Sequence, residues 1–471
     1  MNFVSLIFFA FLLVTVLVYF LLPHKIRWAW LLLASYFFYA FSSYWLAFLI
    51  FSVTLVCYLC ALGIERFPRK SKLFLSLSLI ISLGALFVFK YLNFTIQTVS
   101  FFVKLAGNGR GFDPLDIILP VGISFYTFQA LSYVVDVYRG RSKVERHFGY
   151  FALFVSYFPQ LVAGPIERFD ALMPQLKEEH RFDSENFLTG FRYMLIGYFK
   201  KVVIADFLAI FVNRVYGDIP GHDGTAIILA TVLFAFQIYG DFSGYSDIAR
   251  GTSKIMGIDL MQNFDSPYMA TSIRDFWRRW HISLTKWFTD YVYIPLGGSK
   301  KGKFRHCLNV MIVFLLSGLW HGADLKFVVW GALHGLFLII GIMLPKSNRE
   351  KGKMLTWASR IGTFLLVCFA WVFFRANSLG EAWSAITKIF SGWNIQGGLI
   401  PMIEVSFLLR LVVCFACFGL IGYVPLISLK EGKEQNWHAL GAVGITMLLI
   451  GLSWAMNYAS GGGSAFIYFQ F

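Results

Sequence analysis

The sequence has few charged residues. Asp, Glu, Lys and Arg together make up 14% of its 471 residues, whereas an ordinary soluble domain has roughly a quarter. Apolar residues account for 58%, and the chain contains 52 Phe and 14 Trp. A soluble protein of this length could not keep so much apolar surface away from water. The composition excludes a cytosolic enzyme, a disordered chain and a secreted disulfide scaffold, and it predicts an all-α polytopic membrane protein.

Several motifs that would indicate a soluble enzyme are also missing. The sequence contains no Walker motif, no H-E-x-x-H and no G-x-S-x-G, which argues against an ATPase, a metalloprotease or a serine hydrolase. The nine histidines are scattered, and both C-x-x-C pairs lie within apolar runs without a charged neighbour. Cysteines in such surroundings pack as small hydrophobic residues. We therefore expect no metal site.

Apolar stretches that could cross about 30 Å of hydrocarbon recur along the chain. Some are short enough to be re-entrant, so we expect about 11 to 13 transmembrane or re-entrant helices in a single domain over residues 1–457. The predicted helices lie near residues 3–22, 28–44, 46–62, 73–93, 116–138, 148–163, 190–214, 225–247, 307–320, 326–344, 356–374, 404–425 and 437–457.

The excess of basic residues, which gives a net charge of +15, is spread over short runs between these stretches. The runs at 24–27, 65–72, 345–353 and 430–433 are typical of cytoplasmic loops. No single basic face is available for a nucleic acid, so membrane lipid is the expected surrounding. Counting spans from these loops predicts a multi-pass plasma-membrane protein with both its N-terminus and its tail at 458–471 outside the cytoplasm.

Residues 248–305 are too polar to span a membrane but rich in aromatic residues, which predicts an interfacial or re-entrant segment. Within it, residues 272–287 have the pattern of one amphipathic helix. Five side chains would share one face of that helix: Arg274, Trp277, Arg278, His281 and Thr285. Such a face suits a nucleotide-bearing thioester, or equally the phosphates of lipids.

A histidine within an apolar span is costly and tends to be functional. His321 lies between Gly318 and Gly322, which permit close approach of a ligand or backbone, and we favour a functional role for it. His334 lies in a G-x-x-x-G packing face. The sequence supports a structural role and a direct role in function about equally for this residue. The carboxylates of Asp136, Asp241 and Asp247 are expected to pair with the arginines and so to fix helices, which is a structural role.

Taken together, these motifs resemble those of the membrane-bound O-acyltransferase (MBOAT) family. It is similar to the membrane subunit of alginate O-acetyltransferase and to related bacterial enzymes that acetylate cell-envelope polysaccharides. The matching blocks occur in order at residues 33–40, 119–128, 161–166, 239–247, 276–284 and 318–323.

The resemblance implies helices around a central tunnel, with His321 as the catalytic histidine and His281 as the second histidine on the acyl pathway. The implied donor is acetyl-CoA at the cytoplasmic face, bound by Arg274, Trp277 and Arg278. The implied partner is an extracytoplasmic acceptor, such as an SGNH-like acetyltransferase. Relatives that transfer D-alanine from a carrier protein provide an alternative, and a transporter or flippase of an envelope precursor is a more distant one.

The chain ends in Phe-Ile-Tyr-Phe-Gln-Phe, residues 466–471. This tail resembles a C-terminal motif found in teichoic-acid D-alanylation, in which the tyrosine relays the acyl group. The resemblance implies that Tyr468 is a catalytic residue that forms an acyl-tyrosine. The alternative is that the aromatic tail only anchors the chain at the membrane interface.

Overall fold

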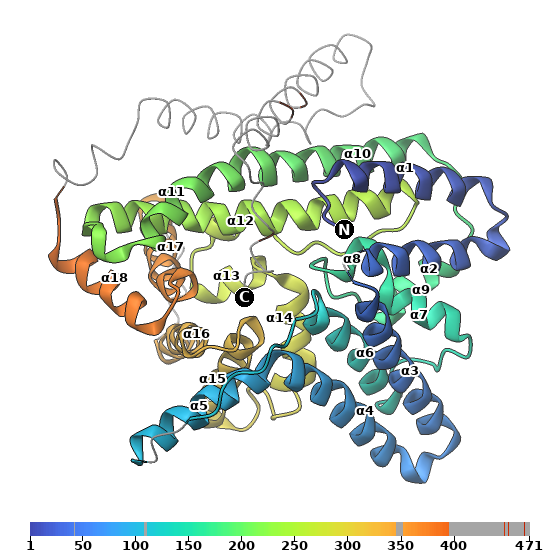
Figure 1. Cartoon of the computed structure of the whole chain (residues 1–471), viewed down its shortest axis with the longest axis horizontal. Coiled ribbons are helices and arrows are strands. Elements are labelled where there is room, and N and C mark those ends of the chain that lie inside the picture. The colour runs from blue at the N-terminus through green and yellow to red at the C-terminus, as the bar shows by residue number, and fades with distance from the viewer. Residues whose placement is uncertain are drawn as a thin grey trace. The chain divides into compact units, whose positions relative to one another are not determined.

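The computed structural model describes residues 1–41, 43–107, 111–344 and 352–394, together with Met447, Gly451 and Phe466. Throughout these residues the regular structure is helical, which confirms the predicted all-α class (Figure 1). The predicted spans near 404–425 and 437–457 lie almost entirely outside the described residues.

Six helical stretches in the described part of the chain are long and apolar enough to cross a membrane. They are α3 (Tyr44–Arg66), the stretch Pro68–Leu105 with α4 (Ser71–Leu86) and α5 (Leu92–Leu105), α12 (Gly224–Ile255), α15 (Gly302–His321), α16 (Leu325–Met343) and α17 (Lys353–Arg375). Each coincides with a predicted span.

Other predicted spans form shorter or interrupted helices. The predicted span at 148–163 is divided into α7 (Phe148–Ser156) and α8 (Phe158–Leu161). Pro159 stands in the first turn of α8, and a proline ring cannot continue the preceding helix because it lacks the N–H group and clashes with the previous turn. The remaining short helices include α1 (Leu6–Leu21), α2 (His24–Ala40), α6 (Ile123–Tyr138) and α9 (Phe169–Lys177).

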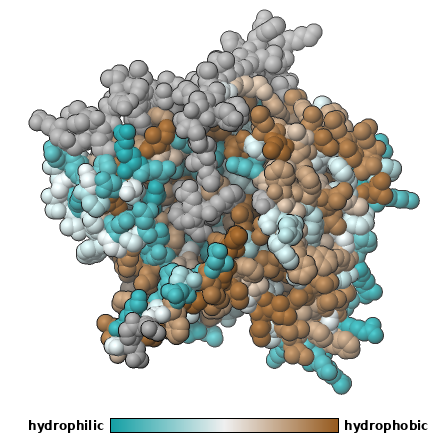
Figure 2. Space-filling view, in the orientation of Figure 1, coloured by the Kyte–Doolittle hydropathy of each residue, from teal (hydrophilic) through white to brown (hydrophobic). Residues whose placement is uncertain are grey.

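Large apolar side chains cover much of the visible surface (Figure 2). On α1, for example, Leu13 is 62% exposed and Leu21 is 81% exposed. Contiguous exposed apolar surface is unfavourable in water but matches the hydrocarbon core of a bilayer. Together with the six apolar helices, this surface is that of a multi-pass membrane protein.

The chain divides into two compact units, each assembled from separate parts of the sequence. One unit contains residues 1–191, 249–265 and 277–324. The other contains residues 192–248, 266–276 and the described residues from 325 onward, which include α11 (Asp206–Gly217) and α18 (Leu379–Ser391). The helices α10 (Ser184–Tyr198), α12 and α13 (Ile273–Arg279) contribute residues to both units.

Buried ion pairs hold the second unit together. A π-helical segment, η3 (Phe199–Ala205), carries Lys201, whose Nζ lies 2.8 Å from the Asp206 carboxylate and 2.7 Å from the Asp241 carboxylate. The neighbouring Lys200 pairs with Asp247 at 2.6 Å. Both α12 carboxylates thus form structural pairs, as predicted, and the partners identified here are lysines, whereas the prediction named arginines.

Two glycines bring α10 and α12 into backbone contact within this unit. A Cβ atom added to Gly197 would lie 2.6 Å from the carbonyl oxygen of Gly244, and one added to Gly244 would lie 2.7 Å from that of Gly197. Small residues at such positions allow helices in membranes to approach closely.

We therefore expect Gly197→Leu to lower the free energy of unfolding by about 1–3 kcal/mol, the usual effect of overpacking. Thermal unfolding of the detergent-solubilised protein measures the change. Gly362→Leu on α17 is the matched control, because no atom lies within 4 Å of the added Cβ. Equal melting temperatures for the two variants would show that the α10–α12 contact is not tight.

Candidate functional site

The predicted single helix over 272–287 is wrong, because the structure interrupts it at His281. The first part, α13, ends at Arg279, and the second, α14, covers Ile282–Phe288. His281 stands between them with φ 43° and ψ 55°, a left-handed conformation that no helix of L-residues can continue. His281 and Thr285 therefore do not extend the face of α13.

The predicted donor-binding residues of α13 also differ from one another in exposure. Arg274 and Arg278 are exposed. Trp277 is only 6% exposed, and its ring packs edge-on against Phe314 of α15 at a centroid distance of 5.1 Å. Trp277 thus belongs to the packed interior, whereas the two guanidinium groups remain accessible to a ligand.

Asn263 stabilises the turn that holds His281. Its side-chain oxygen accepts a hydrogen bond from the backbone N–H of Ser283 at 3.1 Å, and its backbone oxygen accepts one from Ile282 at 3.0 Å. These are N–H groups of the first turn of α14, which a helix cannot satisfy internally. His281 occupies the N-cap position without a side-chain capping bond. A residue distant in sequence therefore caps α14 in place of His281.

The structure brings the two predicted catalytic histidines of the first unit against one indole ring. His321 is the last residue of α15 and is 3% exposed, and His281 is fully buried. The ring of Trp320 lies 5.0 Å from the ring of His321 and 5.9 Å from that of His281. Phe125 of α6 completes the group, 5.1 Å from Trp320 and 6.2 Å from His281.

The aromatic group around Trp320 is buried, which affects the polar atoms that lie within it. His281 lies in a turn outside the six candidate spans. Burial lowers the pKa of its imidazole to about 3, so the ring is neutral at pH 7. The indole Nε1 of Trp320 is buried and has no acceptor among the described residues. The neutral imidazole of His281 can therefore accept a hydrogen bond, and the indole N–H of Trp320 can donate one.

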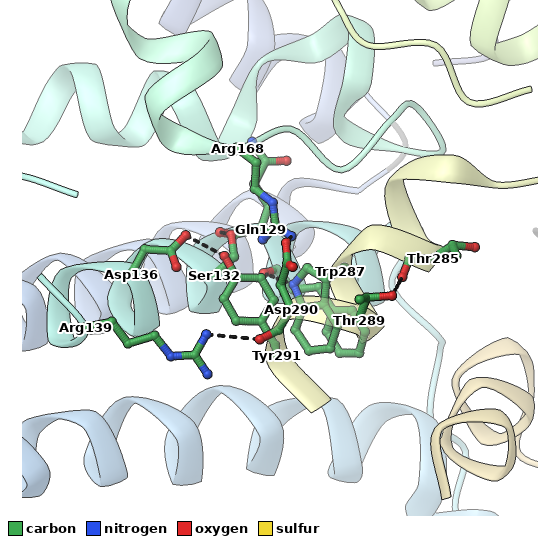
Figure 3. Close-up of polar contacts among 11 residues, drawn as sticks. Gln129, Ser132, Asp136, Arg139, Arg168, Thr285, Trp287, Thr289, Asp290 and Tyr291 are labelled. Carbon is green, nitrogen blue, oxygen red and sulfur yellow. Dashed lines mark hydrogen bonds and ion pairs between the residues drawn. The ribbon is translucent and has the colours of Figure 1, made fainter. Parts of the chain in front are cut away.

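Contacts between α14 and α6 hold His281 beside Phe125. The ring of Trp287 stacks on Phe128 with the centroids 3.8 Å apart, and its Nε1 donates to the Phe128 carbonyl at 3.0 Å. At the other end of α6, the Asp136 carboxylate accepts a hydrogen bond of 2.5 Å from the Tyr291 hydroxyl (Figure 3). Tyr291 belongs to η6 (Thr289–Tyr293), which follows α14 directly.

Two arginines complete this polar cluster. Arg168 forms an ion pair with Asp290 at 2.7 Å, and its guanidinium lies 4.4 Å from the centroid of the Tyr291 ring (Figure 3). Arg139 donates to the Asp290 carbonyl oxygen at 3.0 Å. Asp136 does not have the expected arginine partner, because no arginine of the described residues lies within 4.0 Å of its carboxylate and Arg168 pairs with Asp290 instead. These contacts join α6 to the segment that follows His281.

His334 lies in the other unit. It is fully buried on α16, where its ring is stacked on that of Phe276 at 6.2 Å and lies edge-on to that of Trp330 at 4.9 Å. These aromatic contacts favour the structural role among the two that the sequence left open. Among the described residues, no group of three or more His, Cys, Asp or Glu side chains could hold a metal ion.

Two residues of the site were missed in the sequence. Trp320 is adjacent to His321, and its position in the Gly-Leu-Trp-His block was the available signal. Asn263 had none, because its partner lies 20 residues further along the chain and the turn that joins them could not be predicted.

The capping role of Asn263 gives a stability prediction. Asn263→Leu leaves the Ser283 N–H buried without an acceptor, and we expect it to lower the free energy of unfolding by about 1–3 kcal/mol. Asn263→Thr keeps an uncharged acceptor oxygen and serves as the control. Denaturation in mixed micelles measures both variants, and an Asn263→Leu protein as stable as the parent would contradict the assignment.

Comparison with known proteins gives consistent matches. A family model described as MBOAT, membrane-bound O-acyltransferase family, matches residues 144–380, which contain both histidines of the site. The chain is 36% identical to a probable alginate O-acetylase of Pseudomonas putida, with 98% of each chain covered. It is also 36% identical to a peptidoglycan O-acetyltransferase of Helicobacter pylori, with 79% of this chain and 76% of the relative covered.

A more distant relative carries a different name. The teichoic acid D-alanyltransferase of Bacillus subtilis is 28% identical, with 56% of this chain and 70% of the relative covered. The family model and the extent of the first two matches agree. The chain belongs to the membrane-bound O-acyltransferase family and is a multi-pass O-acyltransferase.

Proposed function

We propose that the protein transfers an acetyl group from cytoplasmic acetyl-CoA across a bacterial plasma membrane, for O-acetylation of an extracytoplasmic cell-envelope polysaccharide. The observation that carries this proposal is the placement of His281 and His321 against Trp320. The names of the alginate and peptidoglycan relatives support acetyl as the group and an envelope polymer as the acceptor.

In the proposed reaction His321 is the general base. Its imidazole removes the proton from the attacking hydroxyl, whose oxygen forms a bond to the thioester carbonyl carbon. The carbon–sulfur bond breaks, and the coenzyme A thiolate takes up the proton from the imidazolium. His281 positions the acyl group within the same aromatic surroundings.

The proposed nucleophile is Tyr468, which would form an acyl-tyrosine. A partner hydroxyl, on an SGNH-like acetyltransferase, then attacks this ester and releases the free phenol. Tyr468 lies outside the described residues, but Phe466 is 2% exposed and packs 4.7 Å from Tyr245 and 5.8 Å from Phe242 of α12. The burial of Phe466, two positions before Tyr468, supports this proposal.

The donor would be recognised by its phosphates. Arg274 and Arg278 are exposed and four positions apart on α13, a spacing that places both guanidinium groups on one side of the helix. Trp277 supports this helix from within. The proposed orientation puts the basic loops on the cytoplasmic side and both the N-terminus and the tail outside, as the charge distribution predicts.

D-alanyl transfer from a carrier protein is the second candidate, supported by the teichoic acid D-alanyltransferase match. Its identity and coverage are lower than those of the acetylating relatives. A transporter or flippase would give no reason for two histidines to share one indole.

We expect His321→Ala to reduce acetyl transfer by about 10²- to 10⁴-fold, the usual loss for a general base. The measurement is the acetyl content of envelope polymers in cells that express equal amounts of each variant. His306→Ala, at the other end of α15, is the matched control and should retain activity. Normal acetylation by a stable His321→Ala protein would refute its assignment as the base.

Tyr468→Phe removes the hydroxyl and keeps the aromatic ring, so a relay role predicts loss of acetylation as complete as in His321→Ala. An anchoring role predicts normal acetylation instead. Tyr458→Phe, upstream in the same region, controls for the loss of a phenol as such. Expression and membrane insertion of each variant are followed by quantitative blotting.

A further inference from the structure

The carbonyl end of α15, which presents His321, is held by a lysine from a distant part of the chain. The Nζ of Lys90 donates to the carbonyl oxygen of Trp320 at 2.6 Å and to that of His321 at 3.2 Å. The hydroxyl of the adjacent Tyr91 donates to the carbonyl oxygen of Leu319 at 2.9 Å. Three consecutive carbonyl groups are thus bound by two neighbouring side chains.

Both side chains come from a π-helical segment, η2 (Phe87–Tyr91), between α4 and α5. π-helical turns are rare and occur frequently at functional sites. In Figure 1 the α4–α5 segment lies beside α15, as the hydrogen bonds require. The additional residue of a π-turn brings Lys90 and Tyr91 to the same helix end.

The end of α15 has a specific need for such donors. The last carbonyl groups of an α-helix have no partner within the helix, and they carry the negative end of its dipole. Water satisfies them in a soluble protein, but water is scarce at membrane depth. A lysine is the side chain best suited to this position, because it supplies several N–H donors and a positive charge.

Lys90 differs in its partners from the buried Lys201. Lys201 is neutralised by two carboxylates. Lys90 has no carboxylate within 4.0 Å among the described residues, and its charge meets only carbonyl oxygens and the face of Trp320, 5.9 Å away. A charge is expensive in an apolar span. An ion-pair role cannot explain this one.

We propose that Lys90, assisted by Tyr91, is a positioning residue that sets the orientation of Trp320 and His321 for acyl transfer. This inference rests on the role proposed for His321. Fixing the carbonyl groups fixes the peptide planes on either side of the imidazole, and with them the direction in which it approaches the nucleophile. A displacement of about 1 Å at a reacting group can reduce a rate about a hundredfold.

The test uses the full-length protein in liposomes, with labelled acetyl-CoA as the donor. Lys90→Met should lower kcat about a hundredfold while KM for acetyl-CoA is unchanged. Lys90→Arg keeps the charge and the N–H donors and should recover most of the loss. Tyr91→Phe should lower kcat about fivefold, as expected for one hydrogen bond. Lys104→Met is the control, since Lys104 is an exposed lysine of the adjoining helix α5.

Normal kcat in Lys90→Met, or an equal loss in the Met and Arg variants at unchanged melting temperature, would overturn the inference. If Lys90→Met does not accumulate, Tyr91→Phe decides, and an unchanged kcat overturns it. Activity in His321→Ala would instead overturn the proposed function. An inactive His321→Ala protein beside a fully active Lys90→Met protein would overturn only the positioning role.

Discussion

The constraint on which the structure depends is that a polar group inside an apolar chain must find its partner within the protein. Lipid offers no hydrogen bonds, and an unsatisfied backbone group costs several kcal/mol there. The chain responds with partners from distant sequence positions. Lys201 pairs with Asp241 of α12, Asn263 caps α14, and Lys90 binds the terminal carbonyl groups of α15. Each contact joins segments that no local pattern connects.

The same constraint explains the form of the site. His281 lies in a left-handed turn and not in a regular helix. Its side chain does not cap α14, and its ring lies near that of Trp320. His321 stands at the end of α15, where the helix no longer satisfies its own carbonyl groups. Both histidines are thus found where regular structure ends. There the backbone can be shaped by neighbouring side chains, and the imidazoles meet across one indole.

The sequence allowed prediction of the helical class and of the six long apolar helices, because each depends on local hydropathy. It did not allow prediction of the break at His281, since periodicity continues through a turn that Asn263 stabilises from outside. The role of Lys90 was also hidden, because a lysine in an apolar span has no visible partner until α15 is placed beside it. Neither the periodicity nor the composition of a sequence predicts which distant segments will be in contact.

The central claim of the proposed mechanism is that the acetyl group of acetyl-CoA becomes covalently attached to this chain before it is passed to the partner protein. Mass spectrometry of the purified protein, incubated in liposomes with isotopically labelled acetyl-CoA, tests it directly. We expect one labelled acetyl group on the C-terminal peptide that contains Tyr468, together with the release of free coenzyme A. This labelling should be lost in His321→Ala. An unmodified C-terminal peptide in a preparation that still releases coenzyme A and acetylates its acceptor would contradict it.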